Sequence, residues 1–168
     1  MKRWLGIDPL AVLAGIVLVA SLLQPWWSFD MGLPEFTDVY PYVMRGPGTE
    51  FVGYRRTSQM EMATYALAAA AIFIVLGAVL RGWKGRIPLL LAAAVIWLIR
   101  SRFWVRIQDM AARNDFQLNG SGWAEYESAM AIVWVTTRIG EGFRLAAVAA
   151  GLCLLAALLH GWLTLPRE

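Results

Sequence analysis

Four long apolar stretches constrain the fold of this chain more than any other feature. They are 9–23, 62–80, 87–105 and 145–165, and they carry almost no charge. A helix needs about 20 residues, at about 1.5 Å per residue, to cross a hydrocarbon core about 30 Å thick. Hydrophobic residues make up 59% of the chain and charged residues 16%, a bias away from soluble proteins. We therefore expect an integral membrane α-helical protein with a four-transmembrane-helix bundle.

The expected organisation is a single membrane domain over residues 1–168. The predicted spans are 9–25, 62–81, 87–113 and 142–165, with long outer loops at 26–61 and 114–141. The third span includes Arg100 and continues with helical spacing to residue 113, so its helix is expected to extend outward. A cleaved signal peptide ending near Val19-Ala20-Ser21 is the alternative for the first segment. Because Val19 is larger than the alanine that such sites prefer, a retained helix is expected.

The distribution of basic residues predicts the orientation. Lys2 and Arg3 precede the first helix, and Arg81, Lys84 and Arg86 fill the short turn between the second and third helices. Short segments rich in Lys and Arg stay in the cytoplasm. We therefore expect a multi-pass cell-membrane protein with both termini cytoplasmic and both long loops extracytoplasmic. The net charge is +3, but the basic residues cluster in the short polar segments beside the spans, as in a membrane protein. We therefore expect no nucleic-acid partner.

Both long loops contain strand-like segments. In the first loop these are 26–29, 38–44 and 50–56, rich in aromatic and β-branched residues and separated by turn signals. In the second loop, 129–138 is one further strand candidate that follows the glycine-rich stretch at 119–122. A small extracytoplasmic antiparallel β-sheet is the predicted arrangement.

This organisation resembles the claudin and PMP22-like four-transmembrane superfamily. The stretch Pro25-Trp26-Trp27 is similar to the Pro-x-Trp with which many of those proteins leave their first helix. The resemblance implies that strands of both loops join into one sheet standing on the bundle, and it implies a role in lateral or adhesive contacts. The chain departs from the family at Gly32-Leu33, which is followed by Pro34, and its loops lack the family's cysteine pair.

The residues that could carry chemistry are few. Cys153 is the single cysteine, which excludes a thiol oxidoreductase working through a cysteine pair, and His160 is the single histidine. Metal sites draw on several such ligands, so no metal and no cofactor are expected. His160 is predicted to contact headgroups or a neighbouring helix. The spans show neither a carboxylate pair nor an internal Gly-Pro break, which disfavours a self-sufficient pump.

The loops instead suggest contacts, because aromatic residues and arginine are favoured at protein interfaces. The predicted function is a non-enzymatic membrane protein that self-associates or serves as an accessory subunit of a larger complex. An oligomeric channel or carrier and a lipid-acting enzyme that uses the outer carboxylates are the alternatives. The residues predicted to contact a partner or membrane lipids are Trp26, Trp27, Tyr40, Tyr42, Phe51, Tyr54, Arg102, Trp104, Arg106, Trp123 and Trp134.

Overall fold

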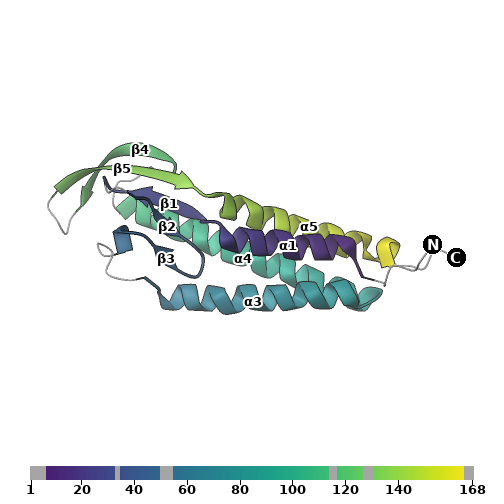
Figure 1. The fold of residues 1–168 in the computed structure, drawn as a ribbon. Coiled ribbons are helices and arrows are strands. Elements are labelled where there is room, and N and C mark those ends of the chain that lie inside the picture. Colours follow the sequence, from purple (N-terminus) through teal and green to yellow (C-terminus); the bar gives the residue numbers. More distant parts are fainter. Residues whose placement is uncertain (1–6, 33–34, 50–54, 114–116, 127–130, 165–168) are drawn as a thin grey trace.

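Helices aligned side by side form the body of the protein. The computed structural model describes residues 7–32, 35–49, 55–113, 117–126 and 131–164. Its helices are α1 (Pro9–Leu23), α3 (Ser58–Val79), α4 (Trp83–Arg113) and α5 (Glu141–Thr164). In the bundle, α1 packs against α3 and α5, and α4 packs against the same two helices (Figure 1). The helices α3, α4 and α5 are long and apolar enough to cross a membrane, whereas α1 has 15 residues.

The helix ends follow local signals with two differences from the sequence analysis. Asp8 caps α1, since its side chain accepts from the amides of Leu10 and Ala11, and Pro9 suits the first turn because it lacks an N–H. The third predicted span starts earlier than expected, at Trp83 instead of residue 87, so Pro88 lies inside α4. The helix α3 likewise starts at Ser58, before the predicted residue 62. Polar residues at these starts are tolerated because they lie at the ends of the bundle.

A five-stranded antiparallel sheet lies at one end of the bundle, opposite the end where α1 starts and α5 finishes (Figure 1). Its strands are β1 (Trp27–Asp30), β2 (Thr37–Val39), β3 (Met44–Arg45), β4 (Gly120–Tyr126) and β5 (Ala131–Ile139), in the order β3-β2-β1-β5-β4. The central β1 pairs with β5, with Trp27 opposite Ile139 and Asp30 opposite Thr136. The two long loops therefore meet in one small antiparallel sheet.

Two strand predictions were wrong in detail. The expected strand 38–44 is split, because the chain turns between Tyr40 and Val43, whose backbone groups hydrogen bond, and the proline at position 41 favours that turn. The second loop has two strands instead of one. Its additional strand β4 begins with Gly120, Ser121 and Gly122, residues of low strand propensity, and pairing with β5 along its whole length outweighs that preference. The predicted strand 50–56 lies mostly outside the described residues.

The sheet and the bundle share one hydrophobic core at their junction. The ring of Trp26 packs edge to face on Phe103 of α4 and Phe143 of α5, with ring centroids 5.2 and 5.9 Å apart. Gly142 lets α5 start against the end of α1, because a Cβ there would lie 2.4 Å from the carbonyl oxygen of Gln24. The sequence analysis noted the apolar content of this region, but the close approach of the two helix ends required the tertiary structure.

Candidate functional site

The two tryptophans that leave α1 are inside the protein, which corrects their prediction as lipid or partner contacts. The side chains of Trp26 and Trp27 have no exposed surface. The indole of Trp26 donates to the Ser21 carbonyl oxygen at 3.1 Å, and that of Trp27 donates to the Leu118 carbonyl oxygen at 3.1 Å. An indole has one polar atom, and here the backbone satisfies it, so burial of the whole ring is favourable. The pair joins the sheet to the bundle.

Tyr40 and Tyr42 of the first loop lie between the sheet and the end of α1. Tyr42 is half-buried and donates its hydroxyl to the Leu22 carbonyl oxygen at 3.0 Å, so it is tied to its own chain. The ring of Tyr40 lies 5.6 Å from that of Tyr42, and the Arg45 guanidinium lies over it at 5.3 Å. Burial, and then the nearby Asp38 carboxylate, raise the pKa of Tyr40. The other two aromatic residues predicted in this loop, Phe51 and Tyr54, lie outside the described residues.

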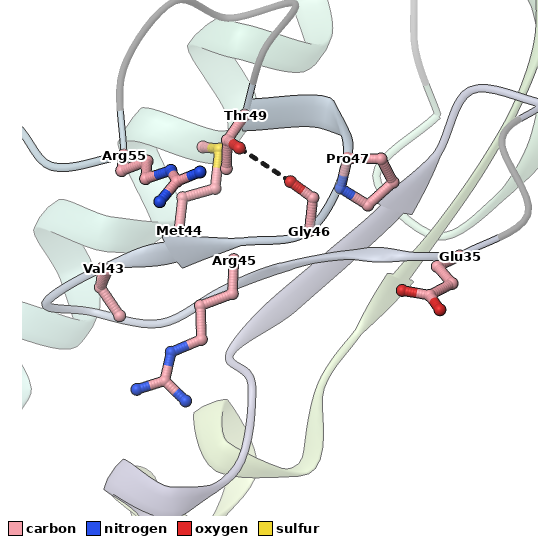
Figure 2. A pocket seen from close by; sticks show the side chains of 8 residues that line it. All are labelled: Glu35, Val43, Met44, Arg45, Gly46, Pro47, Thr49 and Arg55. Carbon is pink, nitrogen blue, oxygen red and sulfur yellow. Dashed lines mark hydrogen bonds between the residues drawn. The ribbon is translucent and has the colours of Figure 1, made fainter.

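An open cleft of about 590 Å³ lies beside β3. Figure 2 shows the guanidinium groups of Arg45 and Arg55 on opposite sides of the β3 ribbon, with Glu35 further along the cleft. A bound anion requires donors that converge on one point. These two arginines do not converge, and the cleft does not form a ligand site of that kind. The remaining lining residues are Val43, Met44, Gly46, Pro47 and Thr49.

The basic residues of α4 divide between solvent and internal contacts. Arg106 donates to the Thr57 hydroxyl at 3.0 Å and to the Gln59 side-chain oxygen at 3.1 Å, so it holds the start of α3. Its predicted contact with a headgroup or a partner remains a prediction. Trp104 is half-buried and stacks on Phe143 at 5.6 Å. Arg102 is exposed, and its predicted contact role remains a prediction.

The β4–β5 hairpin carries the most exposed aromatic residues of the sheet. Trp123 and Trp134 lie opposite each other in the register, with their rings edge to face at 5.2 Å. Their exposed fractions are 64% and 48%, and that of Ile132 is 65%. Since side chains alternate across a strand, these three share one face with Ser121 and Thr136, whose hydroxyls hydrogen bond at 3.0 Å. We call these five residues the hairpin face.

A buried polar pair lies at the end of the bundle opposite the sheet. Its members, Asp8 and His160, are both fully buried. Their side chains meet at 2.8 Å between Oδ2 and Nδ1. The expectation that His160 touches a neighbouring helix is confirmed, whereas the expected contact with lipid headgroups is wrong. The sequence analysis did not pair Asp8 with His160, because no local signal links two residues 152 positions apart.

In the described part of the chain, no three His, Cys, Asp or Glu side chains are grouped as metal ligands would be. Neither a protein-family model nor a curated protein sequence matches this chain. Two features of the described residues stand out: the exposed hairpin face and the buried Asp8–His160 pair.

Proposed function

We propose that this protein is a non-enzymatic membrane protein with four spans, and that its hairpin face binds the hairpin face of a second copy outside the bilayer. The observation that carries the proposal is the exposed tryptophan pair Trp123 and Trp134, with Ile132 beside it. Large apolar side chains gathered on one exposed face mark contact sites, and tryptophan is prominent among the residues that dominate binding energy.

The position of α1 supports the fourth span. Asp8, just before α1, contacts His160 near the end of α5, and Ser21 donates its hydroxyl to the Gly142 carbonyl oxygen at the start of α5 at 2.7 Å. His160 lies 18 positions after Gly142 in α5, a rise of roughly 27 Å, which is close to the thickness of a hydrocarbon core. The short α1 with its cap thus extends along nearly the whole height of a membrane-length helix.

The orientation follows from the charges at the two ends. Arg81, Lys84 and Arg86 lie in and just after the turn between α3 and α4, at the same end as Asp8 and His160. By the bias of cytoplasmic segments toward Lys and Arg, this end faces the cytoplasm and the sheet lies outside. A bundle with an overlong α4 and a sheet built from both loops is also the arrangement implied by the claudin-like resemblance.

Lipid does not account for the exposed residues of the hairpin face. Exposed apolar residues along the helices, such as Ile72 and Val75 of α3, lie where acyl chains would cover them. The hairpin extends beyond that bundle at the sheet end (Figure 1), where the surroundings are aqueous under the proposed orientation. An uncovered tryptophan pair is unfavourable there, so a protein surface is the cover that fits its chemistry.

A second copy is the occupant favoured by geometry. Copies inserted in the same orientation hold the same surface at the same distance from the bilayer, and a two-fold axis along the membrane normal brings identical patches together. Edge-to-face aromatic packing suits such a self-complementary contact. A different membrane protein bound as the main subunit of a complex is the competing occupant.

Disulfide trapping in native membranes tests the contact. In a Cys153→Ala background, Ser121→Cys places a thiol on the hairpin face, and we expect mild oxidation to give a band at twice the monomer mass. Ser58→Cys is the matched control, because Ser58 is also exposed and starts α3 at the sheet end. We expect little cross-linking there.

Adding Trp123→Ser and Trp134→Ser to the Ser121→Cys protein should reduce the dimer band at least about tenfold, the effect of losing about 1.4 kcal/mol of binding energy. Equal cross-linking at the two cysteine positions would overturn self-association through the hairpin face. So would a dimer band that stays unchanged when the two tryptophans are replaced. A cross-link to another protein that needs the tryptophans would also overturn it, in favour of the accessory-subunit role.

A further inference from the structure

Two ionisable side chains are buried together at the end of the bundle opposite the sheet. Asp8 and His160 each have an exposed fraction of 0%. The imidazole lies between two oxygens, with Nδ1 2.8 Å from Asp8 Oδ2 and Nε2 2.8 Å from the Leu80 carbonyl oxygen. Buried ionisable groups persist only when they are paired and hydrogen bonded. The contacts of this pair therefore report its protonation state.

A count of donors and acceptors gives the number of protons. The Leu80 carbonyl only accepts, so Nε2 must carry a hydrogen. A bare Nδ1 would then set its lone pair against a carboxylate oxygen at 2.8 Å, which is repulsive, so a second proton must lie between Nδ1 and Oδ2. The pair thus holds one proton more than a neutral histidine beside an ionised aspartate, and it is neutral as a whole.

The environment of the carboxylate decides where that proton lies. Asp8 Oδ1 accepts from the amides of Leu10 and Ala11 at 2.9 and 3.3 Å, at the N-terminus of α1. Amides and the dipole at a helix N-terminus favour the negative form of a carboxyl group. The carboxylate therefore stays ionised, and the proton resides on the imidazole.

We propose that Asp8 and His160 form a proton-binding site, an imidazolium–carboxylate pair that closes this end of the bundle. The site joins three helices directly, since Asp8 caps α1, His160 belongs to α5, and Leu80 is the C-cap of α3. The backbone amide of Asp8 also donates to the Ala78 carbonyl oxygen of α3 at 3.0 Å. Loss of the shared proton leaves one bare ring nitrogen against an acceptor, either the Asp8 carboxylate or the Leu80 carbonyl oxygen, and weakens the contact of α5 with α1 or with α3.

The helix α4 covers the site and excludes water from it, because Gly85 lets this helix approach the imidazole closely. A Cβ on Gly85 of α4 would lie 2.3 Å from His160 Nε2 and 2.3 Å from the Leu80 oxygen. No side chain fits in that space, so only glycine lets α4 close over the imidazole. Within the described residues, the other charged groups at this end are Arg81 and Lys84, which are exposed, and Arg86, which is half-buried. Asp8 is thus the carboxylate that compensates the imidazolium among the described residues.

Nitrogen NMR tests the proton directly, because His160 is the chain's single histidine and needs no assignment. The full-length protein, labelled with ¹⁵N-histidine in lipid nanodiscs, is measured at about pH 7.5, where a histidine free in water is neutral. We expect both ring nitrogens to show protonated shifts. A bare-nitrogen signal from either position would overturn the proposal.

Asp8→Asn is a matched variant that keeps the hydrogen bonds and removes the extra proton. Its amide oxygen still caps α1, and its amide N–H donates to the Nδ1 lone pair of a neutral imidazole whose Nε2–H still reaches Leu80. In this variant we expect one protonated and one bare nitrogen. Two protonated nitrogens in the variant would show that the Asp8 carboxylate is not what keeps the proton on the imidazole, and the proposal would fail.

The single cysteine reports whether the bundle end opens. Cys153 is fully buried and lies two turns before His160 in α5, so a membrane-permeant maleimide labels it only when the helices separate. We expect labelling of the wild-type protein to accelerate at least about tenfold relative to Asp8→Asn when the pH is raised from about 7 to about 10. Dividing the labelling rate of the wild-type protein by that of Asp8→Asn at each pH removes the ordinary increase in thiolate, which is the same in both proteins. Parallel pH profiles for the two proteins would overturn the proposal.

Discussion

The two ends of this molecule differ in which kind of side chain they bury and which kind they expose. At the Asp8–His160 end, polar groups are completely buried, and each nitrogen of the imidazole faces an oxygen of the same chain. At the sheet end, the apolar rings of Trp123 and Trp134 face outward on the hairpin face. The comparison teaches that residue type alone does not reveal function here. The polar pair is satisfied inside its own chain, whereas the exposed rings of the hairpin face carry the contact proposed with a second copy.

The largest difference between the two kinds of surface is expected when one buried and one exposed tryptophan are each replaced by alanine. Trp26→Ala removes a fully buried ring from the junction between Phe103 and Phe143, and we expect a loss of about 3–5 kcal/mol in the free energy of unfolding. Trp123→Ala removes an exposed ring, and its effect on stability should stay within about 0.5 kcal/mol.

Thermal unfolding in mild detergent measures both variants, with a thiol-reactive dye that reports exposure of Cys153. Similar losses of stability in the two variants would mean that the hairpin face is packed against its own chain. The distinction between the two ends would then be wrong.

A glycine pair offers a smaller perturbation at the Asp8–His160 end. Gly85→Ala forces a methyl group against His160 and Leu80, and we expect a loss of about 1–3 kcal/mol, typical of overpacking. Gly151→Ala in α5 is the control, since a Cβ there meets nothing within 4 Å, and it should be neutral or stabilising. The same dye assay measures both, and equal midpoints for the two variants would contradict the close packing of α4 over the site.

Two arginines of α4 allow the same contrast between an internal contact and an exposed side chain at the sheet end. Arg106→Met keeps the apolar stem but removes the hydrogen bonds to Thr57 and Gln59, so the start of α3 should fray at a cost of about 1 kcal/mol. Arg102→Met changes an exposed side chain and should leave that helix start unchanged. Amide hydrogen exchange of Met60 gives the readout, because its N–H donates to the cap Thr57. Faster exchange in both variants would count against a specific role for Arg106.

The smallest expected effect is a pH dependence at Tyr40. Its pKa is raised above 10, chiefly by burial, so the unfolded state ionises first as the pH rises. Any stabilising effect is therefore present below about pH 10 and decreases as the pH rises through the folded-state pKa. Tyr40→Phe should flatten the stability profile slightly in that range, measured against the wild-type protein by phenolate absorbance and dye-monitored unfolding. Identical profiles would mean that Tyr40 ionises as freely as in water.

The sequence predicted the elements better than it predicted the fate of single side chains. The predicted strand 129–138 is present as β5, because its run of β-branched residues is a local signal. The strand β4 escaped the sequence analysis, because its glycines become extended only through their pairing with β5. Trp26 and Trp27 were taken for contact residues for a related reason: a bilayer interface and a buried junction favour the same amphipathic ring.

Long apolar helices and strands in both long loops could be predicted from the residues alone, because hydrophobic runs and strand propensity act over short stretches of chain. Which tryptophans are buried and which are exposed depended on the folded structure. It also brought Asp8 to His160 across 152 positions. The reason is physical: burial and hydrogen-bond pairing depend on what the rest of the chain places beside a residue, and no local pattern carries that information.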